Sequence, residues 1–141
     1  MANPSEGIRD LLVAADVGEF NVTKGWNIVI SRIIDDPNTL IVIYDSGGQS
    51  PNPQWLVNYP SVQVRVRGGA NDYTATRAKC REIQDALLGL NSQDINGDRW
   101  VSITQLGDIN WVGYDSNNRP QFTLNFRLII EPPEGTHRES L

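Results

Sequence analysis

SVQVRVRGG, from Ser61 to Gly69, is the stretch that decides the fold. Three valines alternate with Gln63, Arg65 and Arg67, and two glycines end the run. An alternation with period two predicts a β-strand with one apolar face and one polar face. The valines must face a core, because an apolar row in water would be costly. Both arginines are therefore expected on the opposite face, outside the core of the subunit.

The sequence after the glycines predicts a helix and a meander of strands. Asp72 is suited to the N-cap of a helix that continues to about Leu90 with apolar residues at three-four spacing. RWVSITQL (99–106) and INWVGY (109–114) flank Gly107-Asp108, which predicts a two-residue hairpin. QFTLNFRLII (121–130) alternates again and predicts the last strand, with Arg127 on its polar side.

The sequence before this stretch predicts a helix, two buried strands and a loop. The helix is expected from Ser5, as its N-cap, to Ala15. WNIVISRII (26–34) and LIVIYD (40–45) are apolar on both alternating faces, so both faces need cover, for example a helix on one side and a neighbouring subunit on the other. DSGGQSPNPQ (45–54) has the composition of a loop.

These segments predict a single α+β domain: a largely antiparallel, mixed sheet with two helices packed on one face. The 141 residues suit one domain, which we place at residues 1–131. Residues 132–141 are polar and rich in proline, and predict a loose C-terminal tail.

Composition excludes several classes of function. The net charge of -5 argues against wholesale binding of nucleic acid or anionic membranes. Cys80 is the only cysteine, so no intrachain disulfide can form. The N-terminus does not resemble a signal peptide, and the apolar runs are too short to span a bilayer. We expect a soluble protein that folds in a reducing cytoplasm and has no membrane partner.

The residues that could carry catalysis do not form a recognisable constellation. His137 is the only histidine and lies in the predicted tail, and Cys80 lies on the apolar stripe of a helix. DINGD (94–98) begins like a calcium loop but has Arg99 where glycine is required. The sequence predicts no catalytic residue, no metal site and no cofactor. One enzymatic alternative remains, a carboxylate site in which these three residues converge: Asp94, Asp98 and Asp108.

Two surfaces are candidates for binding, each with a simpler alternative. Trp55, Leu56 and Tyr59 are large apolar side chains beside a predicted loop. They either anchor an interface or fold back over the core of the domain. The polar strand face with Arg65, Arg67 and Arg127 either meets an acidic partner or lines a channel, or it is simply solvated.

Three motifs carry a resemblance to a known family. WLVNYPSVQVRVRG (55–68), KCREIQDALLGL (79–90) and GDINWVGYDSNNRPQFTLNFRLIIEP (107–132) resemble the minor capsid proteins understood as tail terminators of long-tailed phages. These are distantly similar to the terminator of phage lambda. The resemblance covers about Pro53 to Pro132, and none of the motifs is catalytic.

The resemblance implies a structural virion protein with no catalytic residues and no cofactor. It implies a ring, usually hexameric, on the head-proximal end of the tail tube, which stops tube polymerisation and offers a surface for head-tail joining. The partners are then further copies of the chain, the tail tube protein and the head-tail connector, and DNA passes through the lumen without sequence-specific recognition. The alternative is another neck protein, for head completion or connection. The matched positions that become interface candidates are Trp55, Leu56, Tyr59, Arg65, Arg67 and Arg127.

Overall fold

The computed structural model describes residues 3–20, 25–52 and 57–131. The elements, in chain order, are α1 (Pro4–Ala14), β1 (Glu19–Phe20), β2 (Asn27–Ile30), β3 (Leu40–Asn52), β4 (Val57–Arg67), α2 (Tyr73–Leu88), β5 (Gln93–Ile95), β6 (Asp98–Tyr114) and β7 (Pro120–Glu131). The residues 132–141, predicted as a tail, lie outside the described part.

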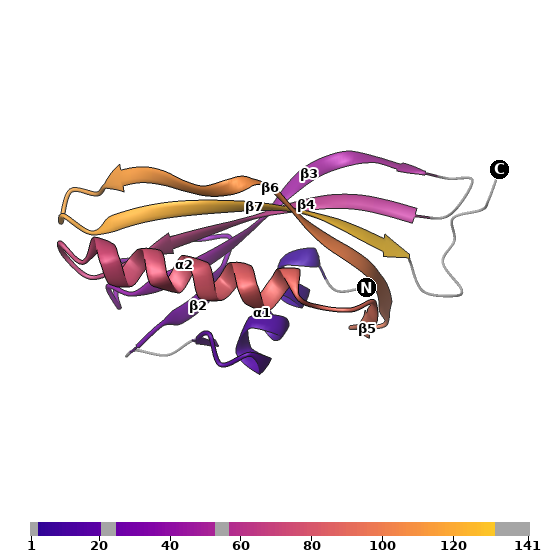
Figure 1. Cartoon of the computed structure of the whole chain (residues 1–141), viewed down its shortest axis with the longest axis horizontal. Helices are drawn as coiled ribbons and strands as arrows, with labels where there is room; N and C mark the ends of the chain where they lie inside the picture. The colour runs from indigo at the N-terminus through magenta and orange to yellow at the C-terminus, as the bar shows by residue number, and fades with distance from the viewer. Residues whose placement is uncertain (1–2, 21–24, 53–56, 132–141) are drawn as a thin grey trace.

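All seven strands form one sheet in the order β1-β2-β3-β4-β7-β6-β5. β1, β2 and β3 pair in parallel, and every other neighbouring pair is antiparallel. The single domain with two helices and a mixed sheet agrees with the predicted α+β class (Figure 1).

The centre of the sheet is the antiparallel pair of β4 and β7. Val62, Val64 and Val66 pair with Phe126, Leu124 and Phe122. All six side chains are fully buried, and they belong to one core cluster with residues of α1 and α2. We call this side of the sheet the core face. α1 contacts β2, β3 and β4, whereas α2 contacts β4, β6 and β7.

The two helices begin differently from each other. Asp72 accepts a hydrogen bond from the Ala75 amide at 3.4 Å, so its predicted role as the N-cap of α2 is confirmed. The prediction for α1 is wrong by two residues, since Asn3 is the N-cap. Ser5 lies inside the helix and is buried, and its amide and hydroxyl donate to the Asp45 carboxylate at 2.9 and 2.7 Å.

The predicted loop at residues 45–54 is wrong for residues 45–52, because β3 continues to Asn52, which pairs with Val57 of β4. Residues 53 and 54 lie outside the described residues. Gly47 and Gly48 stand opposite the single residue Pro60, so the strand contains a bulge. Gly48 has a φ of +73° and close contacts with the β4 backbone, which only glycine tolerates. Pairing with β4 therefore overrides the loop-like composition.

The predicted hairpin at Gly107-Asp108 is also wrong. β6 runs without a turn from Asp98 to Tyr114 along β7. Gly107, Asp108 and Ile109 stand opposite the single residue Leu124, and Gly107 has a φ of +77°. A bulge uses the same left-handed glycine as a hairpin turn, so the dipeptide alone cannot distinguish them.

The first of the two apolar strands is shorter than predicted, and ends at Ile30 where Ser31 has a φ of +66°. In the second strand, Leu40, Ile41, Val42 and Ile43 are all fully buried within one chain. Both faces are thus covered without a neighbouring subunit. On the side away from the core face, the cross-strand partners of Leu40 and Val42 are arginines, whose methylene stems can cover apolar neighbours.

We predict that Gly68→Ala destabilises the fold and that Gly69→Ala does not. A Cβ at Gly68 would overlap the buried Thr76 side chain, whereas a Cβ at Gly69 has open space. Overpacking of this kind costs about 1–3 kcal/mol. Urea denaturation of both variants measures the difference. Equal stabilities would show that α2 can shift away from the sheet at no cost.

Candidate interaction surfaces

The side of β4 and β7 opposite the core face carries polar residues, and we call it the polar face. It is formed by Ser61, Gln63, Arg65 and Arg67 of β4 and by Gln121, Thr123, Asn125, Arg127 and Ile129 of β7. The Gln63 amide donates to Asn125 Oδ1 at 3.2 Å, and the Asn110 amide of β6 donates to the Thr123 hydroxyl at 3.3 Å. Among the β4 and β7 positions on this face, Glu131 at the end of β7, opposite Arg99 of β6, is the one acidic residue.

Arg65 lies at the centre of the polar face and is half-buried. Its cross-strand neighbours are Val42 and Thr123. Its Nε is buried and donates to no acceptor among the described residues. A buried donor without an acceptor is costly, so the Arg65 guanidinium can gain from an oxygen atom supplied by a partner.

Arg67 does not lie on an open surface, so the prediction that both arginines are outside the core is wrong for this residue. Its side chain is 3% exposed. The guanidinium donates to the carbonyl oxygens of Ile34, Asp35, Pro37 and Asn38 at 2.7–3.1 Å. Burial and the nearby Arg119 lower the pKa of Arg67. Arg67 therefore fixes the loop between β2 and β3.

Arg119 fixes the same loop, and sequence reasoning missed it. It is 6% exposed and donates to the Asp35 carbonyl at 2.8 Å, to the Asp35 carboxylate at 3.0 Å and to the Asp115 carboxylate at 2.7 Å. Burial alone would raise the pKa of Asp115, but hydrogen bonds from Arg119 and Asn117 hold it below its ordinary value. The sequence feature that could have indicated this ion pair is the spacing of Asp115 and Arg119 at the two ends of a predicted turn.

Of the other interface candidates, Tyr59 and Arg127 lie on described strands. Tyr59 is half-buried and pairs with Gln49 of β3. This part of the β3–β4 pair lies beyond Ile43, the last residue of β3 that pairs with β2. Arg127 is half-buried on the polar face, between Ser61 and Thr104. Trp55 and Leu56 lie outside the described residues.

A cluster of aromatic side chains near the end of β6 was not predicted as a surface. The Trp111 ring centroid lies 5.0–5.1 Å from those of Tyr73, Tyr114 and Phe122, and the Tyr73 and Phe122 centroids are 5.2 Å apart. Trp111 is 42% exposed and Tyr114 is 53% exposed. Exposed aromatic residues beside a strand edge are typical of interfaces. In the sequence, the two aromatic residues of WVGY (111–114) could have indicated this surface.

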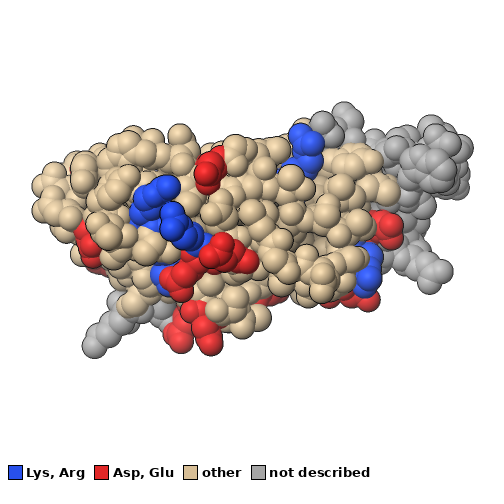
Figure 2. All heavy atoms as spheres, viewed as in Figure 1, with Lys and Arg blue, Asp and Glu red and all other residues tan. Residues whose placement is uncertain are grey.

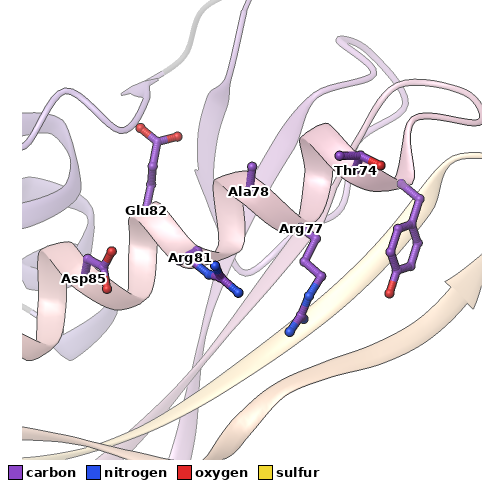
Figure 3. Close-up of a pocket in the computed structure, with 7 residues that line it drawn as sticks. Thr74, Arg77, Ala78, Arg81, Glu82 and Asp85 are labelled. Carbon is purple, nitrogen blue, oxygen red and sulfur yellow. The ribbon is translucent and has the colours of Figure 1, made fainter.

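The outer side of α2 carries charges of both signs around an open groove of about 430 Å³. Figure 3 shows Arg77 and Arg81 pointing to one side of the helix and Glu82 to the other. Figure 2 shows charged side chains gathered over α2 and few over the strands above it. Because these side chains diverge, the groove lacks the converging polar groups of a ligand site.

The three carboxylates of the enzymatic alternative do not converge. Asp98 and Asp108 lie ten residues apart on one strand, which separates them by about 30 Å. Burial raises the pKa of Asp98, whereas hydrogen bonds from Ile109 and Gln84 lower the pKa of Asp108. Asp94 is exposed and forms an ion pair with Arg99 at 3.3 Å.

Cys80 is fully buried, and burial raises the pKa of its thiol to about 12. A buried thiol of this kind is inert, which agrees with a structural role. In the described ranges, no group of three or more His, Cys, Asp or Glu side chains is arranged to hold a metal ion. No helix in these ranges is long and apolar enough to cross a membrane. His137 lies outside them.

Comparisons with known proteins identify the class. Residues 11–132 match the family described as "Bacteriophage tail terminator protein", so the chain belongs to this family of structural phage tail proteins. The prediction that it is not an enzyme is thereby confirmed. Among solved structures, a chain of the "Virion of native gene transfer agent (GTA) particle" shares the fold, with a TM-score of 0.68 and 15% identity. The match covers 91% of this chain and 94% of the other. A comparison with curated protein sequences gives no match.

We predict that Arg67→Ala lowers the free energy of unfolding by roughly 3 kcal/mol, because four carbonyl oxygens lose a charged donor. Arg127→Ala is the matched control on the same face and should cost less than about 1 kcal/mol. Thermal and urea denaturation compare the two variants. If both variants lose the same stability, Arg67 does not fix the loop.

Proposed function

We propose that this chain forms a ring, with six subunits as the expected number, on the head-proximal end of the phage tail tube. The ring ends tube polymerisation and offers a surface for joining to the head. The family match supports a structural protein of the virion tail. The ring and its contacts are proposed from the polar face, where the Arg65 Nε is buried and has no acceptor among the described residues.

The charge distribution supports a protein partner on the polar face. The chain has 17 acidic and 12 basic residues, yet the β4 and β7 positions on this face include a single acidic residue, Glu131 at the end of β7. Arg65 and Arg127 lie there half-buried. Carboxylates on an adjacent subunit or on the tail tube protein would supply the missing acceptors. We infer that both helices cover the core face and leave the polar face open.

The proposed interface includes the interface candidates except Arg67. Tyr59, with Trp55 and Leu56, supplies apolar anchors. Arg65 and Arg127 supply charges. Arg67 is excluded because its guanidinium already binds four carbonyl groups of its own chain.

The remaining partners follow from the proposed position. The tail tube protein lies on one side of the ring and the head-tail connector on the other, after assembly in the host cytoplasm. The net charge of -5 suits a lumen through which DNA slides, since phosphate is repelled and not held. The second candidate is another neck position, and binding of the purified chain to the tail tube or to the connector side distinguishes the two.

Electron microscopy of the purified protein, together with its mass in solution, tests the ring. The proposal expects closed rings of one uniform size that bind one end of isolated tail tubes. A protein that stays monomeric and leaves tube length uncontrolled would contradict the proposal.

We predict that the double variant Arg65→Ala, Arg127→Ala assembles poorly but still folds, with a small loss of stability because the Arg65 stem no longer covers Val42. A partly desolvated charge pair across an interface can cost roughly 2–5 kcal/mol when one partner is removed. The yield of rings or completed tails should fall, and assembly of the wild type should weaken as salt rises.

The matched control removes the same charge from the outer side of α2, as Arg77→Ala with Arg81→Ala, and should assemble normally. Thermal denaturation checks that each variant is folded. Normal yield for the Arg65 and Arg127 variant would make these residues ordinary solvated sheet residues.

A further inference from the structure

We propose that the sheet continues from one subunit to the next, by pairing of β6 in one copy with β3 in its neighbour. The pairing is antiparallel and joins the segment Val101–Leu106 to the segment Tyr44–Gly48. This inference rests on the ring of the proposed function and names the backbone contact that joins its subunits.

The first free edge belongs to β6. One side of β6 pairs with β7 along its length, whereas β5 covers the other side only at Asp98, Arg99 and Trp100. From Val101 to Tyr114 that outer side has no strand partner in the described part of the chain. A strand edge of this length is a template for pairing with another chain.

The β6 edge also lacks the features that usually protect an exposed strand. Residues 101–114 contain no lysine or proline, and Asp108 is their single charged residue. Five large apolar side chains in the segment are exposed: Val101, Leu106, Trp111, Val112 and Tyr114. An apolar edge with a single charge favours aggregation unless a partner covers it, so we infer that a specific partner does.

The second free edge belongs to β3. β2 pairs with β3 only at Leu40–Ile43, and Ser31 then leaves the sheet after one more backbone hydrogen bond to Ile43. From Tyr44 onward the outer side of β3 has no strand partner among the described residues. Among the described residues, the central sheet thus has one free edge on each side.

The two free edges lie at the same level of the sheet. Ser46 pairs with Ser61, Ser61 with Arg127, and Arg127 with Thr104, which makes one continuous row from β3 to β6. The next row runs through Tyr44, Gln63, Asn125 and Leu106. A second copy that is rotated but not translated along the strands therefore brings its Ser46 opposite Thr104.

The strand directions fit the same arrangement. β3, β4, β7 and β6 alternate in direction, so β6 and β3 run opposite to each other. A rotated neighbour then presents its β3 antiparallel to β6, and the row through Ser46 and Thr104 keeps its side chains on the polar face. A head-to-tail contact made by rotation without translation closes into a ring when the rotation angle divides a full turn. A second copy is therefore the occupant that the geometry favours.

The test is a disulfide between subunits in the double variant Ser46→Cys, Thr104→Cys. Directly opposed residues in an antiparallel pair have Cβ atoms about 4.5–5.5 Å apart, close to disulfide geometry. Within one chain β3 and β6 are three strand spacings apart, about 14 Å, so an internal bridge cannot form. The buried Cys80 does not compete. We expect a ladder of covalent oligomers that disappears on reduction.

The matched control is Ser46→Cys, Asn110→Cys, which uses the same two strands. Asn110 pairs with Thr123, four residues along β7 from the Arg127 row, so it lies about 13 Å away from the expected partner. It should give no ladder. Ser102→Cys and Leu106→Cys, each with Ser46→Cys, test a register shifted by two residues.

The outcomes separate this inference from the proposed function. A ladder from Ser46 with Thr104, Ser102 or Leu106, and none with Asn110, supports the edge pairing. Rings of normal mass without a ladder, or an equal ladder from Asn110, overturn the edge pairing and leave the ring intact. A monomer that gives no ladder contradicts both. If the chain's own residues 132–141, or only a strand of the tube protein, cover these edges, rings would form without a ladder. That result counts against the inference.

Discussion

The antiparallel pairing of β4 with β7 is the constraint on which the rest of the structure depends. It joins segments that are about sixty residues apart, and it places the valines of β4 against Phe122, Leu124 and Phe126. Because strand side chains alternate, this register also fixes the arginines on the other side. The same pairing determines the core cluster, the polar face and the row of paired residues that places Ser46 of β3 and Thr104 of β6 at the same height in the sheet. A slip of one residue would exchange the two faces.

The sequence predicted the features that depend on local pattern. Alternating apolar residues correctly indicated both central strands, and Asp72 correctly indicated the start of α2. Features that depend on distant pairing were missed. Gly48 and Gly107 lie in segments whose composition is typical of loops and turns. Each nevertheless lies in a bulge of a long strand, because the residues on both sides of the bulge pair with a partner strand.

Position along one strand separates residues that look equivalent in sequence. Arg65 and Arg67 are two residues apart and share a face, but Arg67 lies where the loop after β2 supplies four carbonyl groups. Arg65 lies beyond that loop, with its Nε unpaired among the described residues. A polar alternation therefore identifies a face, whereas the loops around that face decide which residues stabilise the fold and which remain for a partner.

Hydrogen exchange of backbone amides, compared between monomer and ring, tests the central claim most directly. If the sheet continues between subunits, amides of Val101–Leu106 and Tyr44–Gly48 that exchange quickly in the monomer become protected in the ring. Protection on the outer side of α2, with both strand edges still exchanging at monomer rates, would contradict the account.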